Sequence, residues 1–432
     1  MFGSLGDIFR LPDLKRRIFF TIAILFIFRL GAYIPTPGID RAALAGIFRE
    51  TNGVLDFLNL FSGGALSRLG IFSLGVAPYI NSSIVMQLLV VIFPFLEKMQ
   101  KDSTDGQKKI VQWTRYGAVI FALVQSIGMT AWLGSNGIML GGFLNWLLVV
   151  ITLVAGSMAV MWLGEELTDH GIGNGISLLI FAGIVARIPE AIIQTISMVS
   201  IGQLNLIALL IGLVLIVVVV AGCILLQEGQ RRLPVQYAKR VVGNKVYGGQ
   251  STFIPLKVNQ SGVIPIIFAS SLLIFPYTIA NYFVDNAFAR VVRDIFAPNS
   301  FLYLICYVAL IIFFSYFYTA VVFNPTDIAN NMKKYGGFIL GIRPGQPTSD
   351  YITRVMERIT LAGGVFLAIV ALIPNVMSSV LGVNSFYFGG TAVLIVVGVA
   401  MDTVQQVEAQ LLMRNYDGIL KKSGHSRGLL RG

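Results

Sequence analysis

The sequence predicts an all-α membrane protein with many spanning helices, built as two inverted halves. Hydrophobic residues make up 56% of the 432 residues and charged residues 12%, whereas a typical soluble domain is about 25% charged. The mean hydropathy is +0.78. Apolar runs of about 20 residues, each long enough to cross a bilayer as a helix, recur along the whole chain. An ordinary soluble domain is therefore excluded.

Ten apolar runs are expected to span the membrane, and an even number places both ends of the chain on the same side. Most of the 32 Lys and Arg residues fall before the first run, in alternate loops, or after the last run. Because positive segments stay in the cytoplasm, both ends and the two long polar loops are expected to be cytoplasmic. The ten runs are residues 18–34, 74–94, 110–133, 142–163, 176–188, 206–226, 262–281, 301–323, 359–381 and 386–407.

Two long polar loops and a basic tail accompany the runs. Residues 227–260 contain strand-like alternation at 241–249 and 251–258, which predicts a β-hairpin that protrudes into solvent. The second loop covers residues 324–358, and the tail covers residues 410–432.

The stretch that leads into the second run is unusual for a lipid-facing helix. Residues 54–73 are apolar but short, and Gly63 and Gly64 interrupt them. The run that follows carries Pro78 near its start and several polar residues. Irregular backbone at membrane depth is tolerated only where protein or a water-filled cavity surrounds it. This stretch is therefore interpreted as lining and closing a pathway through the membrane.

A six-residue pattern repeats in the second and seventh runs. Residues 75–80 read GVAPYI and residues 262–267 read GVIPII, and serines follow both. The two runs are five apart, and five is odd, so the equivalent helices enter the membrane from opposite sides. This is the parity of an inverted repeat, whose working site lies between the halves near the bilayer midplane. The predicted halves are residues 1–203 and 204–409.

The chain lacks the residue patterns of most membrane enzymes and ion-coupled pumps. Asp and Glu lie in loops or near helix ends, with Asp402 the nearest exception, whereas coupled transporters usually hold an acid within a span. His170 and His425 are far apart, so neither a metal nor another cofactor is expected, and the chain is predicted not to be an enzyme. A secondary transporter of small solutes is the alternative function, and a membrane-bound transferase ranks third.

Two features have both a structural and a functional interpretation. Arg29 lies inside the first run near its far end, and snorkelling of its guanidinium to the interface is favoured over a functional charge. The GIGNG sequence at residues 171–175 superficially resembles a phosphate loop, but it follows no strand. Close helix packing or a helix start is the favoured explanation.

Motifs spread over nearly the whole chain carry a family resemblance. They are SGGALSR at 62–68, LGVAPYI at 74–80, HGIGNGIS at 170–177, EGQRRLPVQYAKR at 228–240, STFIPLKVNQSGVIPIIFASS at 251–271, GIRPG at 341–345 and FYFGGTAVLIVVGVAMD at 386–402. With these motifs the chain resembles the SecY family, the channel-forming subunits of the bacterial protein translocase, related to the alpha subunit of the eukaryotic Sec channel. The family fold is ten transmembrane helices in two inverted five-helix halves around an hourglass pore, with a re-entrant plug helix.

The resemblance implies a passive channel in the cytoplasmic membrane of a bacterium. It would pass secretory polypeptides across the membrane and release transmembrane segments sideways into lipid. A ring of aliphatic side chains would form the waist and exclude ions by dewetting. The implied ring residues are Val76, Ile80, Ile176, Ile180, Ile267 and Ile395. The implied plug, about residues 54–73, includes Leu55, Phe57, Leu58, Leu60, Phe61, Gly63, Gly64 and Leu66. The implied lateral-gate residues are Ser83, Gln87, Gln125, Ser270 and Ser271.

The resemblance further implies partners that complete the channel and supply energy. They are the SecE and SecG subunits, the SecA motor ATPase, the ribosome, signal peptides and nascent chains, and membrane lipid. The two basic loops would dock SecA or the ribosome, whose RNA phosphates attract positive charge. The implied docking residues are Lys239, Arg240, Lys245, Lys257 and Arg343.

Overall fold

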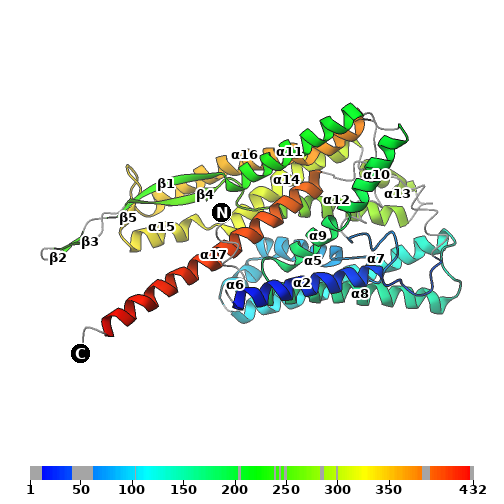
Figure 1. Cartoon of the computed structure of the whole chain (residues 1–432), viewed down its shortest axis with the longest axis horizontal. Helices are drawn as coiled ribbons and strands as arrows, with labels where there is room; N and C mark the ends of the chain where they lie inside the picture. The colour runs from blue at the N-terminus through cyan, green and yellow to red at the C-terminus, as the bar shows by residue number, and fades with distance from the viewer. Residues whose placement is uncertain are drawn as a thin grey trace. The chain divides into compact units, whose positions relative to one another are not determined.

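The computed structural model describes most of the chain. The described residues are 12–40, 62–102, 104–202, 206–237, 240–242, 245–247, 251–282, 287–297, 300–381 and 390–428. They are mostly helical, with two small sheets (Figure 1). The helices are α2 (Pro12–Tyr33), α5 (Ala77–Ile92), α6 (Pro94–Asp102), α7 (Thr104–Ser135), α8 (Phe143–His170), α9 (Gly175–Val185), α10 (Ile188–Ser200), α11 (Leu206–Glu228), α12 (Ile264–Tyr282), α13 (Ala287–Ile295), α14 (Phe301–Val322), α15 (Pro325–Lys334), α16 (Gln346–Leu381) and α17 (Gly390–Gly428). The strands are β1 (Gln230–Tyr237), β2 (Arg240–Val242), β3 (Lys245–Tyr247), β4 (Ser251–Lys257) and β5 (Gly337–Phe338).

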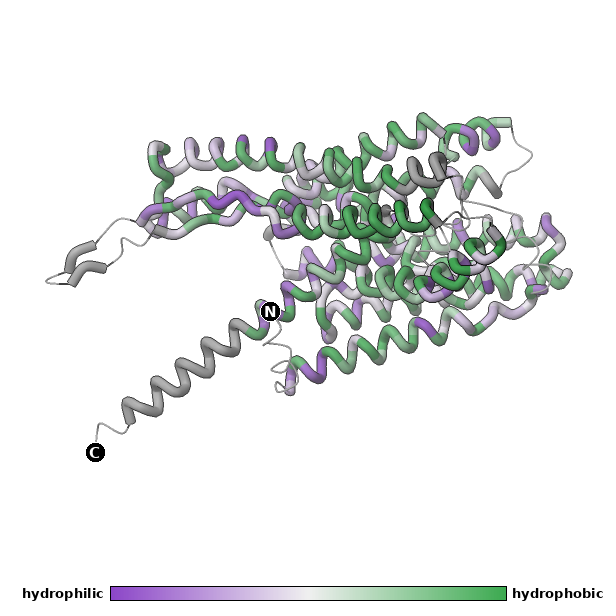
Figure 2. The backbone as a smooth tube through the Cα atoms, turned by 45° about the horizontal axis from the view of Figure 1, so that its top comes forward, coloured by the Kyte–Doolittle hydropathy of each residue, from purple (hydrophilic) through white to green (hydrophobic). Residues whose placement is uncertain are grey.

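Many of these helices are long and apolar enough to cross a membrane. Among the described residues, seven helices meet that test, or eight if the bent pair α5 and α6 counts as one broken span. The bend between α5 and α6 is 106°. Helix α12 is apolar but shorter than the others. Figure 2 shows hydrophobic residues predominating along these helices. The chain is therefore a multi-pass helical membrane protein.

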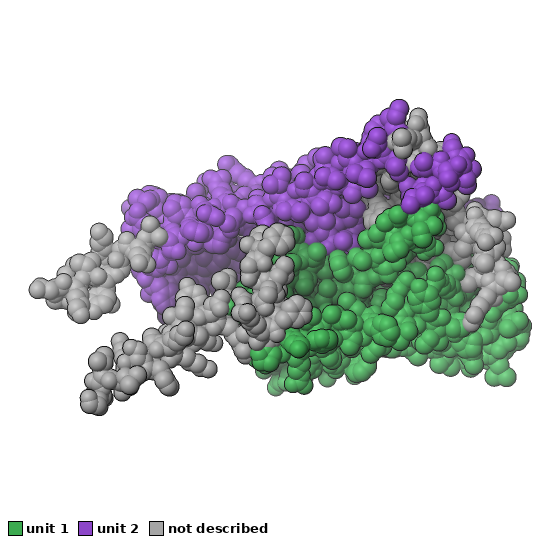
Figure 3. All heavy atoms as spheres, in the orientation of Figure 1, with its two compact units in different colours: residues 1–194, 278–289, 399–432 green, residues 195–277, 290–398 purple. Residues whose placement is uncertain are grey.

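The chain divides into two compact units (Figure 3). Unit 1 comprises residues 1–194, 278–289 and 399–432, and unit 2 comprises residues 195–277 and 290–398.

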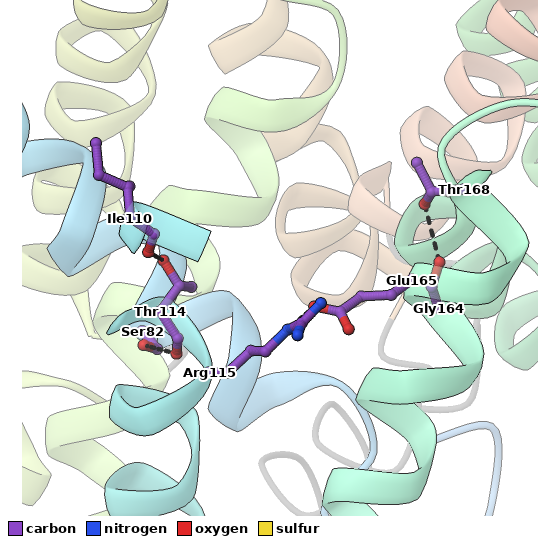
Figure 4. A network of polar contacts seen from close by, with 7 residues as sticks. All are labelled: Ser82, Ile110, Thr114, Arg115, Gly164, Glu165 and Thr168. Carbon is purple, nitrogen blue, oxygen red and sulfur yellow. Dashed lines mark hydrogen bonds and ion pairs between the residues drawn. The ribbon is translucent and has the colours of Figure 1, made fainter. Parts of the chain in front are cut away.

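In unit 1, small and polar residues bring α5 and α7 into close contact. The Ser82 hydroxyl of α5 donates to the carbonyl oxygen of Thr114 in α7 at 2.6 Å (Figure 4). Gly117 lies beside this bond, and a Cβ there would overlap the Ser82 hydroxyl. Ala118 and Ala122 continue the same buried face of α7. Small side chains let two membrane helices approach closely enough for such packing.

Helix α8 is longer than the sequence predicted. The fourth apolar run was expected to end at residue 163, but α8 continues to His170. Its extension carries Glu165, whose carboxylate pairs with Arg115 of α7 at an Nε–Oε1 distance of 2.9 Å (Figure 4). The ion pair neutralises the Glu165 carboxylate. The predicted span ended before this residue because the apolar pattern stops there. Helix α16 is likewise longer than expected, because it begins at Gln346 rather than at residue 359.

The glycine-rich segment before α9 starts a helix and packs closely, as predicted. The Asn174 carboxamide oxygen accepts the backbone N–H groups of Ile176 and Ser177 at 3.1 and 3.2 Å, which caps the helix N-terminus. A Cβ on Gly175 would overlap the carbonyl oxygen of Gly164 in α8. The glycines therefore allow α9 to lie directly against α8.

In unit 2, the two long polar loops fold together into a small domain, here called the platform. Strand β1 pairs antiparallel with β4 and, at its end, with β5. The hairpin predicted at residues 241–258 is wrong in its pairing: β2 and β3 form a small hairpin of their own, whereas β4 pairs with β1 rather than with residues 241–249. The platform has its own core, formed by Leu233, Val235, Leu256, Met332, Ile339, Ile352, Val355 and Met356.

Short connections join the platform to the apolar helices α11 and α12. Strand β1 begins two residues after α11 ends, and β4 leads into α12 within a few residues. The backbone N–H of Val258 donates to the carbonyl of Gly229 at 2.8 Å, which ties the two exits together. Gly363 of α16 packs against the Val258 carbonyl, where a Cβ would stand 2.7 Å away.

Truncating the platform core is expected to destabilise the protein. Ile352 is 0% exposed and belongs to the platform core, so Ile352→Ala should cost about 2–5 kcal/mol. Thermal unfolding of the purified protein in detergent would show a lower transition temperature. Leu340→Ala is the control, because Leu340 is 60% exposed and a surface truncation should change stability by no more than about 0.5 kcal/mol. Equal shifts for both variants would contradict the assigned core.

Candidate functional site

The segment Ser62–Gly75, which precedes α5, is buried but not helical. Its backbone is a series of turns, with bonds from the Gly70 N–H to the Ala65 carbonyl at 2.9 Å and from the Gly75 N–H to the Phe72 carbonyl at 2.9 Å. The Ser62 hydroxyl accepts the Leu66 N–H at 3.1 Å. Irregular backbone must be satisfied internally where water is excluded. Several backbone groups of the segment are hydrogen-bonded within the segment itself, through its turns and the Ser62 hydroxyl.

Helix α2 and the loop after it cover one side of this segment. The Phe28 and Phe72 rings stack with centroids 6.0 Å apart, and Gly31 leaves room for the Phe72 ring, which a Cβ would overlap. The Thr36 N–H donates to the Leu69 carbonyl at 2.8 Å, and the Ile71 N–H donates to the Ile34 carbonyl at 2.9 Å. The segment is thus paired with the chain that leaves α2.

Helices α7 and α8 cover the other side. Leu66 and Leu69 join a buried cluster with Met129 and Leu133 of α7, Ile138, and Val149 and Leu153 of α8. Gly156 of α8 accommodates the carbonyl of Ile71, which a Cβ would overlap. The Ser157 hydroxyl donates to the Gly75 carbonyl at 3.3 Å. Protein, rather than lipid, therefore surrounds this backbone within unit 1.

Leu69 has an unusual backbone conformation. Its φ is +41°, and its side chain is 1% exposed. A positive φ is rare for a residue with a branched side chain. The Leu69 N–H bonds to the Leu66 carbonyl at 3.1 Å, and its own carbonyl accepts from Thr36. Contacts on every side hold this residue in place.

The repeated G-V-x-P-x-I pattern forms the same local structure at both positions. Gly75 and Gly262 have φ values of +54° and +63°, and α5 and α12 begin two residues after them. In the first helical turn, the N–H of Ile80 donates to the Val76 carbonyl at 3.1 Å, and the N–H of Ile267 donates to the Val263 carbonyl at 3.3 Å. The two copies are structural equivalents of each other.

The six predicted ring residues are all shielded from solvent to some degree. In unit 1, Val76, Ile80 and Ile180 are buried, and Ile176 is half-buried. The Cγ1 atom of Ile176 lies against α8, 3.0 Å from the position of a Cβ on Gly164. In unit 2, Ile267 and Ile395 are buried. The structure thus buries five of these six aliphatic side chains and half-buries Ile176.

The predicted plug residues are only partly described. Leu55, Phe57, Leu58, Leu60 and Phe61 lie outside the described residues. Gly63, Gly64 and Leu66 belong to the buried segment, and both glycines have positive φ values.

The predicted gate residues lie on three helices. On α5, the Gln87 carboxamide donates to the Ser83 hydroxyl at 3.1 Å. Gln125 of α7 is 8% exposed. On α12, the Ser270 hydroxyl donates to the carbonyl of Ile267 at 2.9 Å, and Ser271 follows it. These bonds are within single helices.

The predicted docking residues lie on the platform or beside it. Arg240 and Lys245 belong to β2 and β3, and Lys257 ends β4 with an exposed side chain. Lys239 lies outside the described residues. Arg343 is exposed in a turn, and the Thr348 hydroxyl donates to its carbonyl at 2.8 Å. This bond fixes the turn that presents the Arg343 side chain.

Sequence reasoning missed the partners of the buried segment. Arg29, expected to snorkel, donates through Nη1 to the Gly63 carbonyl and through Nη2 to the Tyr33 hydroxyl at 3.2 Å. Nothing in the local pattern pairs α2 with a glycine 34 residues away. A signal was present nonetheless, because a charge that deep in an apolar run requires a polar partner.

Among the described residues, no three His, Cys, Asp or Glu side chains gather as a metal site would require.

These features define a class: multi-pass helical membrane proteins with a buried irregular segment inside a helical unit. The sequence pattern of the SecY family matches residues 70–404. The protein translocase subunit SecY of Corynebacterium glutamicum is 45% identical over 96% of this chain and 98% of its own length. That of Escherichia coli K12 is 46% identical over 96% of this chain and 95% of its own length. The chain belongs to the SecY family.

Solved structures of the same architecture have lower sequence identity. One is a SecY structure described as showing that the plug domain stabilises the closed state of the translocation channel and maintains a membrane seal. It is 20% identical, covers 91% of this chain and 92% of its own, and has a TM-score of 0.65. Another is Sec61 in a canine ribosome–channel complex, 18% identical over 91% and 92% of the two chains, with a TM-score of 0.61. These likenesses establish the fold.

Adding a side chain at Gly156 of α8 is expected to disturb the buried segment. Gly156→Ala places a Cβ on the Ile71 carbonyl, and overpacking of this kind costs about 1–3 kcal/mol. Hydrogen exchange should rise in residues 69–76, and the thermal transition should fall. The matched control is Gly141→Ala, since nothing lies within 4 Å of a Cβ at Gly141. Unchanged exchange in the Gly156 variant would show that α8 does not clamp the segment.

Proposed function

We propose that this chain is the central subunit of a protein-conducting channel in a bacterial cytoplasmic membrane. It passes secretory polypeptides across the membrane and releases transmembrane segments sideways into lipid. Membership of the SecY family supports this role. The single observation that carries the mechanism is the pair of equivalent helix starts, which set Ile80 and Ile267 at matching positions of α5 and α12. Ten spans in two inverted halves, with both ends cytoplasmic, complete the proposed architecture.

The proposed seal is the ring of six aliphatic side chains. Isoleucine and valine offer no hydrogen bonds to water, so a narrow ring of them dewets and excludes ions without a bound ligand. The same side chains can part around a polypeptide, because they make no specific bonds that must be broken. The low exposure of these residues supports this role.

The plug is proposed to close the exterior side of the ring at rest. Its described end, Gly63–Leu66, has positive-φ glycines that a compact hairpin requires. The lateral gate is proposed to include the predicted gate residues of α5, α7 and α12. Hydrophobic segments would leave through it because their transfer into lipid is favourable. The free energy of insertion is about −0.5 kcal/mol for each Leu and about +3 kcal/mol for an Arg at the centre of the helix.

The energy for transport is proposed to come from partners rather than from this chain. SecA or the ribosome would dock on the platform mainly through Arg240 and Arg343, with Lys239, Lys245 and Lys257 in support. A folded platform core supports a docking role, because the exposed Lys257 and Arg343 side chains lie on the same small domain. SecE and SecG are proposed as companion subunits. The chain itself would be a passive channel and not an enzyme.

Reconstitution tests the proposed function directly. Vesicles would hold the chain with SecE and SecG, and SecA, ATP and a secretory precursor would be added outside. We expect ATP-dependent protection of the precursor from protease. Absence of protection with an intact complex, together with uptake of a small solute, would favour a secondary transporter instead.

Polar substitution of the ring is expected to make the resting membrane leak. Ile80→Ser with Ile267→Ser adds hydroxyls that hydrate the constriction, so ion conductance of vesicles without precursor should rise several-fold. Ile151→Ser with Ile305→Ser is the matched control, because these residues are 58% and 49% exposed on α8 and α14. Equal conductance in both double variants would contradict the seal.

Charge reversal at Arg343 is expected to impair transport without unfolding the protein. The Arg343 side chain is exposed, and the turn is held by its backbone, so Arg343→Glu should leave the thermal transition unchanged. SecA-dependent or ribosome-dependent transport should fall about tenfold, because one favourable contact becomes repulsive. Arg343→Lys retains the charge and should keep most of the activity. Normal transport by Arg343→Glu would remove this residue from the docking surface.

A further inference from the structure

Arg29 stands at the edge between the exposed and the packed faces of α2. Phe26, Ile27 and Leu30 are 63%, 48% and 52% exposed, whereas Phe28 is 0% exposed. The Arg29 guanidinium turns to the packed side, where Nη1 donates to the carbonyl oxygen of Gly63. A buried carbonyl of an irregular turn thus receives a charge-assisted hydrogen bond, which is stronger than a neutral one.

Tyr33 connects this bond to a second arginine. Its hydroxyl accepts from Nη2 of Arg29 at 3.2 Å, and the Arg29 guanidinium lies 5.0 Å from the centre of its ring. The Arg68 guanidinium lies 4.3 Å from the same ring centre, within the range of cation–π attraction. Both ends of the turn from Gly63 to Arg68 are therefore held to the last turn of α2.

Gly63 is also pressed against α9. Its φ is +65°, and a Cβ at this position would lie 2.9 Å from the Cα of Gly183 and 3.6 Å from Nη1 of Arg29. Helix α9 carries Ile176 and Ile180, two of the proposed ring residues. Gly63 thus contacts both α2, through its carbonyl oxygen, and α9, which carries two of the proposed ring residues.

The segment after this turn is fixed by different contacts. Leu69 lies in the cluster with α7 and α8, and the backbones of Leu69 and Ile71 pair with the chain after α2. None of these contacts involves Arg29. Loss of the Arg29 bond would therefore free Gly63 and leave the packing of residues 69–76 in place.

We infer that Arg29, with Tyr33, is a latch that holds the turn from Gly63 to Arg68, a described part of the candidate plug, in its resting place. This inference rests on the proposed function, since the plug is proposed there. Arginine suits the role because its planar guanidinium can donate to a carbonyl and a hydroxyl at once while it lies beside a ring, whereas lysine offers a single point charge.

Hydrogen exchange of the complete channel complex in vesicles tests the latch. Arg29→Met should raise exchange of the amides in residues 62–68 by about 10-fold to 100-fold, the effect of losing a hydrogen bond from a charged donor. Residues 69–76 should keep their protection. Arg29→Lys and Tyr33→Phe are milder changes that should each give a smaller rise, and they remain informative if Arg29→Met fails to fold. Lys15→Met is the matched control, a basic residue of the same helix stacked on Phe19.

Unchanged exchange of residues 62–68 in every latch variant would overturn the inference. An equal rise in residues 69–76 would also overturn it, because the whole segment would then have loosened. Ion conductance of the same vesicles separates this result from the proposed function. Faster exchange at 62–68 with a raised resting leak supports both the latch and the plug. Faster exchange without a leak supports the latch and removes the sealing role of this turn.

Discussion

The structure depends on one constraint: backbone that is not helical must find all its hydrogen-bond partners inside the protein where the membrane excludes water. Ser62–Gly75 is such backbone. Its backbone N–H and carbonyl groups form hydrogen bonds within its own turns, with the Ser62 hydroxyl, with the chain that leaves α2, and with Ser157 of α8. The glycines at 31, 70 and 156 let α2 and α8 approach closely enough for this to happen. Helices α2, α7 and α8 of unit 1 therefore pack around a segment whose non-helical backbone could not be exposed to lipid.

The apolar pattern predicted much of the fold. The ten runs overlap helices of the structure, and Asn174 caps the helix that follows the glycine-rich segment. Strands form where alternation predicted them, although β4 pairs with β1 rather than with residues 241–249. The repeat of residues 75–80 at 262–267 was read from sequence alone, and the two copies share a positive-φ glycine and the same helix start. Local patterns succeeded here because helix starts and strands are determined mainly by neighbouring residues.

The remaining features depend on residues far apart in the chain. The extension of α8 through Glu165 relies on Arg115, fifty positions earlier, to neutralise a carboxylate. The positive φ of Leu69 relies on Thr36 and on the cluster with α7 and α8. The bond from Arg29 to Gly63 cannot be read from spacing, because the charge pattern of α2 says only that a partner is needed. Polar contacts between distant segments were the part that sequence could not supply.

The direct junctions of the platform with α11 and α12 have a mechanical consequence. Strands β1 and β4 leave these helices almost at once, and the Val258–Gly229 bond clasps their roots. The platform is therefore continuous with the ends of these helices rather than attached by a long loop. A force applied to the platform, where Arg343 is exposed, would act directly on the ends of α11 and α12, and α12 is one of the two helices that begin with the repeated motif.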